Sequence, residues 1–519
     1  MLDLKLAGGR VVDGTGAPPR RADVGITGTR IAALGDLTAA PARRTLDVSG
    51  LLVCPGFIDA HSHSDVHLLV APAAPSKIHQ GVTTEVIGNC GASAAPRFGA
   101  ARLPADWEAL GLPGTWTTFG EYRRLLEAAR PAVNVVALVG HNLLRAGVVG
   151  YADRAATADE VRTMLRRLEQ ALDDGARGLS TGLIYPPGLF AGADEVAALA
   201  DCVGRRGGVY ASHLRNEGAG LIAALEEFLA AGRTGQGRLQ ISHLKTSGRE
   251  NWARLDQALE LIRRARATGS AVAADRYPYT AAWTDLDVVL PKWAKAGGRD
   301  AILARLRDPA LRARLREELA SSRPPEAWAD VTIGSVTVAE YRHLQGLALS
   351  EAARQLGREP VDTVLELLDR DELRTGAFFA GMSEENLRRI LAEPYVMIGS
   401  DASLRTLDGP LSRDFPHPRA FGTFPKFLRL ALEGRTVPLP EAIRKMTALP
   451  AEHFGLRERG RLAVGCYADV VAFRPETVRD RASYGQPRLL PDGIELVIVN
   501  GVVTLEGGAL TGARAGCVL

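Results

Sequence analysis

Two histidines stand one residue apart at the end of an apolar run, in the segment PGFIDAHSHSD at residues 55–65. In a β-strand, residues two apart point to the same face, so His61 and His63 are expected to share one face. A buried imidazole needs a partner for each ring nitrogen, and a pair at a strand end is typical of a metal site. A satisfied core histidine is the alternative for either residue alone.

Further metal-ligand types end other apolar runs of the chain. His213 lies in ASHLRNE, His243 in ISHLK and Asp401 in IGSDAS. Four histidines and one aspartate at corresponding strand ends form a ring of residue types that ligate divalent metals. Because these residue types recur at the ends of several strands, the alternative that each histidine is an isolated core residue becomes less favoured. Solvent-exposed positions in loops or helices are expected for His67, His79, His343 and His453.

Cys90 follows the second apolar run, in EVIGNCGAS, and offers a thiolate. A free cysteine is more often a small buried hydrophobe, which is the alternative here. Ligation is favoured because the fourth run, ARGLSTGL, has no lysine or carboxylate that could bridge two metals. We therefore expect Cys90 to be a metal ligand that can also act as the anionic bridge.

Hydrolysis is the reaction that such a site predicts. A divalent metal with an open coordination position lowers the pKa of bound water toward about 7. Asp401 could accept the water proton and pass it to a leaving group, provided that it lies within hydrogen-bonding reach. The chain has no GxxxxGK[ST] loop and no HExxH helix, so the reactions that depend on those motifs are not indicated.

Eight short apolar runs between residues 51 and 403 must position these side chains. Most gaps between them hold helical patterns, such as residues 157–175, which begin at a threonine cap and end at a glycine. This alternation predicts an α/β fold, a (β/α)8 TIM-like barrel with its site at the C-terminal strand ends. A doubly wound open sheet is less favoured, because it concentrates its site at one switch point. The runs are LLVCPGFIDAHSH, TTEVIGNCG, VNVVALVGHN, ARGLSTGL, VYASHLRNE, LQISHLK, AVAADRYPY and YVMIGSDAS.

The remaining segments predict two additions to a barrel at residues 56–456. The connection between the seventh and eighth runs, about 284–394, is too long for one loop and predicts a helical insertion over one barrel mouth. Residues 1–55 and 457–519 both hold short β-type runs separated by Gly and Asn. We expect the two chain ends to form one small β-sandwich domain.

Composition restricts the class of partner. The 519 residues, of which 46% are hydrophobic, can bury a large core. A formal charge of +3 gives no electrostatic case for nucleic acid or a membrane surface, so a small-molecule substrate is expected. The start shows no signal-like segment, and the five cysteines lack CxxC spacing. We expect a cytoplasmic monomer or small homo-oligomer with reduced thiols.

Seven segments form a recognisable set: GFIDAHSHSD, GNCGAS, GLIYPPG, ASHLRNE, ISHLK, GSDAS and HPRAFGTFP. Together they resemble the N-acyl-D-amino-acid deacylases (D-aminoacylases) of the amidohydrolase superfamily. The HxH pair alone would indicate only the superfamily, whereas the cysteine and the last segment are more specific. The resemblance covers essentially the whole chain. It implies zinc-dependent hydrolysis of N-acyl-D-amino acids to a carboxylate and a free D-amino acid.

The resemblance also implies roles for the candidate metal ligands. It places a tightly held zinc on Cys90, His213 and His243. It places a weaker second metal position near His61, His63 and Asp401, with Cys90 able to bridge. Asp401 in addition matches the general acid/base of the family.

Three further residues match positions that surround the substrate carbonyl and carboxylate in the family: Tyr185, Lys245 and Tyr277. Packed aromatic rings and a solvated lysine are the alternatives. Period-two counting places Lys245 on the face of His243 and Tyr277 on the face of Asp275, whereas Arg276 must point the other way.

One departure from the family concerns the substrate carboxylate. Some relatives bind it with an arginine just after strand seven, but residues 280–293, TAAWTDLDVVLPKW, contain none. Lys245 and Tyr277 could take this role, or Arg215 or Arg419 could reach in. Nothing in the sequence indicates a preference for acidic D-residues.

Two other functions stay open from the sequence. Cyclic-amide hydrolases, such as hydantoinase- or dihydroorotase-like relatives, normally use a carboxylated lysine on strand four, which is missing here. A non-catalytic scaffold of the same fold would usually lose metal ligands, and this chain keeps the full set.

Overall fold

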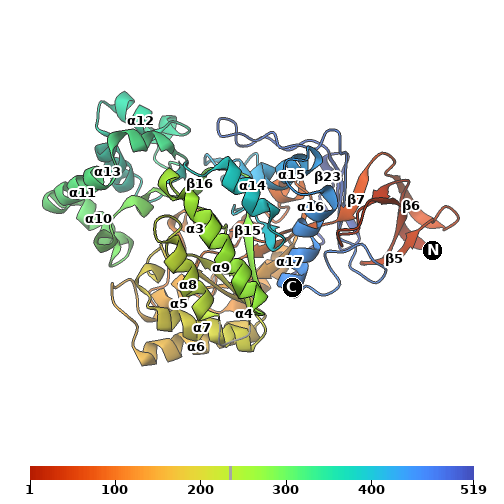
Figure 1. Ribbon diagram of the computed structural model, residues 1–519, viewed down its shortest axis with the longest axis horizontal. Helices are drawn as coiled ribbons and strands as arrows, with labels where there is room; N and C mark the ends of the chain where they lie inside the picture. The colour runs from red at the N-terminus through yellow and green to blue at the C-terminus, as the bar shows by residue number, and fades with distance from the viewer. Residues whose placement is uncertain (233–236) are drawn as a thin grey trace.

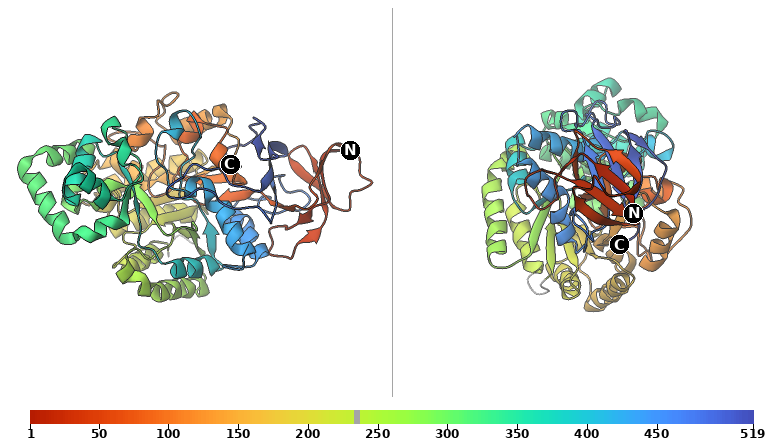
Figure 2. Two further views of the ribbon diagram at one scale, coloured as in Figure 1. Left: turned by 90° about the horizontal axis from the view of Figure 1, so that it is seen from above. Right: turned by 90° about the vertical axis from the view of Figure 1, so that its right-hand side faces the viewer.

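Parallel strands in the middle of the molecule carry the predicted site residues at their ends. The computed structural model describes residues 1–232 and 237–519. These strands lie between a mainly helical lobe and a β-rich lobe at opposite ends of an elongated molecule (Figure 1, Figure 2). Their bounds are β8 (Phe57–Asp59), β9 (Val82–Ile87), β10 (Asn134–Ala137), β11 (Val139–Gly140), β12 (Gly178–Gly182), β13 (Val209–His213), β14 (Arg238–Ile241), β15 (Val272–Arg276) and β19 (Val396–Ile398).

The central strands pair in parallel in two groups, β10-β9-β8 and β11-β12-β13-β14-β15-β19. Their outer ends meet, because the amide of Ala60 donates to the carbonyl of Ile398 (3.2 Å) and Ser62 forms a parallel bridge with Ala402. Each of the eight predicted apolar runs contains a strand. The fold is of the TIM-barrel type, and strands such as β9 are buried at every residue, as parallel strands covered on both faces must be.

Helices cover the central strands. The helix predicted at residues 157–175 is α6 (Ala158–Asp173), where Thr157 and Glu160 form a capping box. The others are α1 (His67–Val70), α2 (Pro75–Ile78), α3 (Ala105–Glu108), α4 (Phe119–Ala129), α5 (His141–Val148), α7 (Ala193–Arg205), α8 (Leu221–Ala231), α9 (Leu255–Ala267), α14 (Glu384–Ala392), α15 (Arg419–Leu432), α16 (Leu439–Met446) and α17 (Ala448–His453).

The segment after β15 forms the helical lobe, which has a core of its own. It differs from the predicted helical insertion in two ways. It contains an antiparallel sheet of order β16-β18-β17, and the predicted range also includes α14, which packs against β19 as part of the central fold. Its elements are β16 (Ala282–Asp285), α10 (Arg299–Arg307), α11 (Pro309–Ser322), β17 (Val331–Ile333), α12 (Leu349–Leu356), α13 (Pro360–Arg370) and β18 (Gly376–Phe379).

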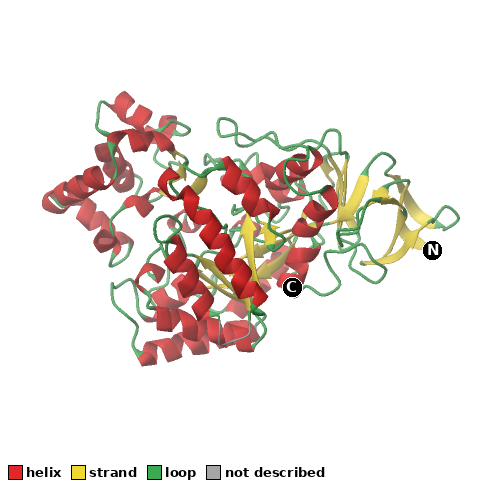
Figure 3. Ribbon diagram, in the orientation of Figure 1, coloured by secondary structure: helices red, strands yellow, loops and turns green. Residues whose placement is uncertain are grey.

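Both chain ends contribute to the β-rich lobe, where strands predominate (Figure 3). Its two sheets share one core, to which Leu6, Ile26, Val470 and Ile498 belong. One sheet has the order β5-β4-β1-β6 and the other β23-β22-β21-β20-β7-β2-β3. The bounds are β1 (Leu2–Ala7), β2 (Arg10–Val11), β3 (Arg20–Arg21), β4 (Asp23–Thr27), β5 (Arg30–Gly35), β6 (Ala42–Asp47), β7 (Leu52–Pro55), β20 (Val470–Phe473), β21 (Ile494–Val499), β22 (Val502–Glu506) and β23 (Ala509–Leu510).

Two parts of the C-terminal segment leave this lobe and contact the rest of the chain. The hydroxyl of Tyr484 accepts a hydrogen bond from the amide of Ala281 (3.2 Å). Val518 pairs with Val135 of β10. Within the described ranges, no helix combines the length and apolar character needed to cross a membrane.

Candidate metal centre and substrate cavity

The structure brings the six predicted metal-ligand residues together at the C-terminal strand ends. Sγ of Cys90 lies 3.3 Å from Nε2 of both His61 and His243. Nε2 of His63 lies 3.1 Å from Oδ1 of Asp401, and the rings of His213 and His243 are 4.5 Å apart. One candidate ion site joins His61, Cys90, His243 and Asp401, and another joins His213, Glu217 and His243.

Three of these residues have left-handed backbone conformations. The φ angles are 53° at Cys90, 35° at His243 and 51° at Asp401. Such angles are costly for residues with a side chain and are concentrated at functional sites. Gly182 permits the Cys90 turn, because a Cβ at residue 182 would lie only 2.0 Å from the carbonyl oxygen of Cys90. The backbone therefore turns within three residues of each strand end and directs these three side chains toward the cavity.

Asp275, at the end of β15, orients two of the histidines. Its carboxylate lies 3.1 Å from Nδ1 of His61 and accepts a hydrogen bond from the backbone amide of His243 (2.8 Å). Burial opposes protonation of His61, but Asp275 and Cys90 together raise the pKa of its imidazole well above the ordinary value. The sequence placed Asp275 on the face of Tyr277 without giving it a role in the site.

Electrostatics favour the anionic forms of Cys90 and Asp401. Burial alone would raise the pKa of the Cys90 thiol, but His61 and His243 hold it well below its usual value. Burial would likewise raise the pKa of Asp401, and Arg419 is the strongest of the groups that hold it well below its usual value. Nη1 of Arg419 lies 2.7 Å from Oδ2 of Asp401. A thiolate and a carboxylate are the forms that bind metal.

A cavity of about 820 Å³ opens over the metal-ligand residues. Tyr185, Lys245 and Tyr277, the residues predicted to contact the substrate, all line it. The hydroxyl of Tyr185 lies 3.0 Å from Oγ1 of Thr284, and Nζ of Lys245 donates to Glu217. The buried hydroxyl of Tyr277 has no hydrogen-bond partner in the described part of the chain, so it is available to a ligand.

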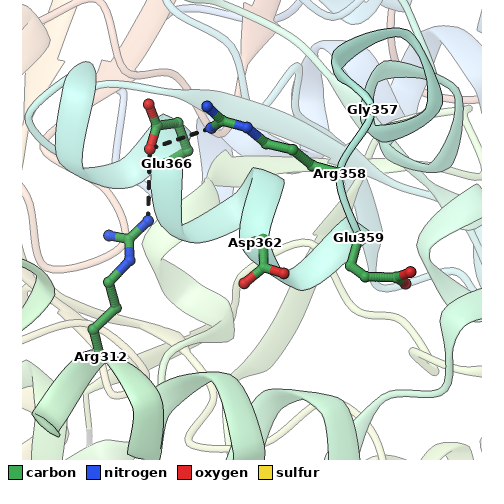
Figure 4. A pocket seen from close by; sticks show the side chains of 6 residues that line it. All are labelled: Arg312, Gly357, Arg358, Glu359, Asp362 and Glu366. Carbon is green, nitrogen blue, oxygen red and sulfur yellow. Dashed lines mark ion pairs between the residues drawn. The ribbon is translucent and has the colours of Figure 1, made fainter. Parts of the chain in front are cut away.

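A second hollow lies far from this chemistry, on the helical lobe (Figure 4). Glu366 of α13 forms ion pairs there with Arg312 (3.6 Å) and Arg358 (3.3 Å). The side chains that line it include no histidine or cysteine. Of these two cavities, only the first is lined by the metal-ligand residue types.

Both arginines considered for carboxylate binding line the cavity, but each is paired with a carboxylate of this chain. Arg215 pairs with Glu227 (2.8 Å), and Arg419 pairs with Asp401. Arg276 donates to the carbonyl of Tyr279 (2.9 Å) and is not among the described residues that line the cavity. Its exclusion from the predicted site agrees with this geometry.

Two histidines expected at the surface are buried. His67 is only 2% exposed and packs edge-on against Trp107, and His453 is 9% exposed and packs against Phe454. The prediction of solvent exposure was wrong for both, because each lies on a short helix that packs inward. His343 is exposed, as predicted.

The donor set fits a zinc ion. Zn–S and Zn–N bonds of about 2.3 and 2.1 Å place sulfur and nitrogen roughly 3.5 Å apart in a tetrahedral site. The two Cys90–histidine distances of 3.3 Å are close to this separation. His213 is buried, and neither of its ring nitrogens has a hydrogen-bond partner among the described residues. Such an orphaned imidazole is expected where a metal would complete the site.

A family model described as "Amidohydrolase family" matches residues 44–505. This chain belongs to the amidohydrolase family. This amidohydrolase is 39% identical to a D-aminoacylase of Alcaligenes xylosoxydans xylosoxydans, over 100% of this chain and 97% of that protein. It is 41% identical to an N-acyl-D-glutamate deacylase of the same organism, over 96% of this chain and 93% of that protein.

A solved structure extends the likeness of this amidohydrolase to three dimensions. It is an N-acyl-D-glutamate deacylase from Bordetella bronchiseptica, complexed with zinc and a phosphonate inhibitor that mimics the tetrahedral intermediate of the reaction. The two chains are 38% identical with a TM-score of 0.85, over 100% of this chain and 99% of the other. The predicted membership of the N-acyl-D-amino-acid deacylase family is confirmed.

Proposed function

We propose that this chain is a zinc-dependent hydrolase that cleaves the amide bond of N-acyl-D-amino acids, giving a carboxylate and a free D-amino acid. The convergence of Cys90, His213, His243 and Asp401 at the base of one cavity supports this function most directly. The deacylase relatives match over nearly the whole chain. Since their names differ in the amino acid, they support the class of substrate and leave the side chain open.

Cys90, His213 and His243 are the proposed ligands of a tightly held zinc. His61, His63 and Asp401 would form a weaker second position, with the Cys90 thiolate able to serve both because it lies 3.3 Å from His61 and from His243. Bound zinc supplies a Lewis acid that polarises the amide carbonyl and makes water acidic.

Asp401 is the proposed general acid/base. Its low pKa keeps it ionised, so it can accept a proton from the attacking water and then deliver that proton to the departing nitrogen. Arg419 and His63 fix the carboxylate from two sides. Restricting it to one position lowers the entropic cost of proton transfer.

Tyr185, Lys245 and Tyr277 are proposed to orient the substrate. Tyr185 is hydrogen-bonded to Thr284 and can be aligned with the substrate carbonyl. The unpartnered hydroxyl of Tyr277 and the ammonium of Lys245 are donors suited to a carboxylate. Arg215 is a weaker candidate for this role, because Glu227 and two backbone carbonyls already accept hydrogen bonds from its guanidinium.

The domain organisation is also a proposal. Residues 56–456 would form a closed (β/α)8 barrel, and residues 1–55 and 457–519 a composite β-sandwich. Sharing of one core by two sheets supports the sandwich. The separate core of the helical lobe supports an insertion after β15, with an end near β18 rather than at residue 394. All five cysteines are free, which supports the further proposal of a cytoplasmic location.

Metal analysis combined with a substrate panel tests the function. We expect zinc to copurify and N-acetyl-D-amino acids to be hydrolysed, whereas N-acetyl-L-amino acids and hydantoin are not. Hydrolysis restricted to hydantoin would favour the cyclic-amide alternative, and hydrolysis restricted to the L series would contradict the proposed stereochemistry. Zinc binding without any hydrolysis would favour the scaffold alternative.

A further inference from the structure

Glu217 lies behind the two histidines that the proposed function assigns to the tightly held zinc. Its Oε1 is 3.0 Å from Nδ1 of His243, and its Oε2 is 3.6 Å from Nε2 of His213. The side chain is 14% exposed and follows β13 in the loop before α8. One carboxylate therefore faces both imidazoles, with a different oxygen for each.

We propose that Glu217 is a positioning residue that fixes the tautomer of both histidines, an inference that rests on the proposed zinc function. A neutral imidazole carries one N–H and one lone pair. When the N–H of His243 is on Nδ1 and donates to Glu217, the lone pair of Nε2 faces Cys90 Sγ. Metal-binding histidines commonly donate their second nitrogen to a carboxylate in this way.

The same argument applies to His213, except that the two ring nitrogens exchange roles: Nε2 faces Glu217 and Nδ1 is left for the metal. An N–H on Nε2 directed at Glu217 leaves the lone pair of Nδ1 for the metal, and that nitrogen has no hydrogen-bond partner in the described ranges. The contact to Glu217 is longer than a hydrogen bond, and a shift of roughly half an ångström would close it. Glu217 can thus orient both ligands without touching the metal.

Lys245 makes a carboxylate at this position necessary. Its Nζ lies 2.7 Å from Nδ1 of His243 and 2.5 Å from Oε1 of Glu217. An ammonium group only donates, so without Glu217 it would donate to Nδ1 of His243 and force the N–H of the ring onto Nε2. That tautomer directs a hydrogen toward Cys90 and the metal position. Glu217 offers an acceptor to both groups, so the ammonium can direct its hydrogens to the carboxylate rather than to Nδ1, although the two nitrogens lie 2.7 Å apart.

A direct ligand role for Glu217 is the other interpretation, because His213, Glu217 and His243 lie close enough to hold an ion. The ammonium of Lys245 argues against it. At 2.5 Å from Glu217 and 2.7 Å from His243, this ammonium already occupies the space of such an ion and would repel it. The geometry therefore favours orientation over ligation.

The zinc dissociation constant of the full-length protein tests the inference, measured by competition with a chromogenic chelator. We expect Glu217→Gln to bind zinc about 10- to 100-fold more weakly than the wild type. Adding Lys245→Met to Glu217→Gln should restore most of the affinity, since no ammonium then competes for Nδ1 of His243. A dissociation constant of Glu217→Gln within about twofold of wild type would overturn the inference, as would a double variant without recovery.

The matched control is Glu227→Gln, which neutralises a carboxylate that also binds a cation, Arg215, but contacts neither histidine. Its zinc affinity should equal that of the wild type. Should Glu217→Gln fail to fold, Glu217→Asp keeps the charge beside Lys245 but is too short to span both imidazoles, and unchanged affinity there would overturn the shared orientation. A wild type that binds no zinc would overturn the proposed function itself.

Discussion

Asp401 combines a low pKa with contacts to His63 and Arg419, and its removal gives the sharpest test at the level of a single residue. Asp401→Asn keeps the shape of the side chain but cannot accept a proton. We expect turnover of N-acetyl-D-amino acids to fall by at least about 100-fold, since general acid–base catalysis contributes roughly 10²- to 10⁴-fold. Zinc bound through Cys90, His213 and His243 should be retained in metal analysis.

Asp408→Asn is the control for this substitution, because Asp408 is an exposed aspartate in the loop that follows Asp401. Its turnover should match that of the wild type. Undiminished turnover in Asp401→Asn would contradict the assigned proton transfer.

Some site residues could be identified from the sequence and others could not, because only some of them lie at positions that a local sequence pattern predicts. His61, Cys90, His213, His243 and Asp401 follow apolar runs, so strand ends alone predict that they meet. Glu217 contacts them only because the loop after β13 turns it back toward His243, and no local pattern encodes that turn. A carboxylate four residues after His213 was the only available signal.

At the level of elements, the short helix α2 connects β8, β9 and the turn that follows β19. Nζ of the fully buried Lys77 lies 2.7 Å from Asp59 of β8 and 3.3 Å from Glu85 of β9. It also donates to the carbonyl of Ala402, the residue after Asp401 (3.0 Å). Lys77 therefore supports the turn in which Asp401 has its left-handed conformation.

Lys77→Met should destabilise the protein strongly, because it leaves two buried carboxylates without their cation. Breaking one side of a buried ion pair costs about 3–5 kcal/mol. We expect a loss of this order in the free energy of unfolding measured with urea. Lys292→Met, which removes an exposed pair with Asp153 and a cation–π contact with Phe190, should change it by only about 1 kcal/mol. If the two variants had equal free energies of unfolding, the buried ion pairs of Lys77 would not stabilise the fold as proposed.

Prediction of the elements themselves succeeded where a pattern is local. The capping box of Thr157 and Glu160 lies within four consecutive residues, and α6 begins directly after Thr157. The sheet of the helical lobe was not predicted, because β17 has three residues and β18 four, and their partners are distant in sequence. Strands of three or four residues show too little alternation of apolar and polar residues to be recognised from the sequence without their pairing partners.

At the level of the whole molecule, the cavity over the metal-ligand residues is lined by more than one folding unit. The base of the cavity is built from the ends of the central strands, whereas Arg323, Asp330 and Phe379 of the helical lobe line its wall. That lobe has its own core, so its sequence can vary without disturbing the metal ligands. This division explains why the metal chemistry was predictable from motifs and the preferred side chain of the substrate was not.

Acid stability is a property of the whole chain to which the buried His453 contributes. Burial first, then Arg238 and Arg266, lower the pKa of its imidazole to about 3 from an ordinary value of 6.5. Above pH 6.5 the imidazole is neutral in both the folded and the unfolded chain. As the pH falls from 6.5 toward 3, only the unfolded chain binds the proton, so the free energy of unfolding decreases by an amount on the order of 4 kcal/mol.

His453→Leu removes this proton-binding site, so we expect the variant to lose less stability than the wild type between pH 7 and pH 4. Urea unfolding at both pH values, with a chelator present in every sample so that zinc release adds nothing, measures the difference. His343→Gln is the control, because His343 is exposed and should leave the wild-type pH dependence unchanged. If His453→Leu lost as much stability as the wild type over this interval, protonation of His453 would not contribute to acid unfolding.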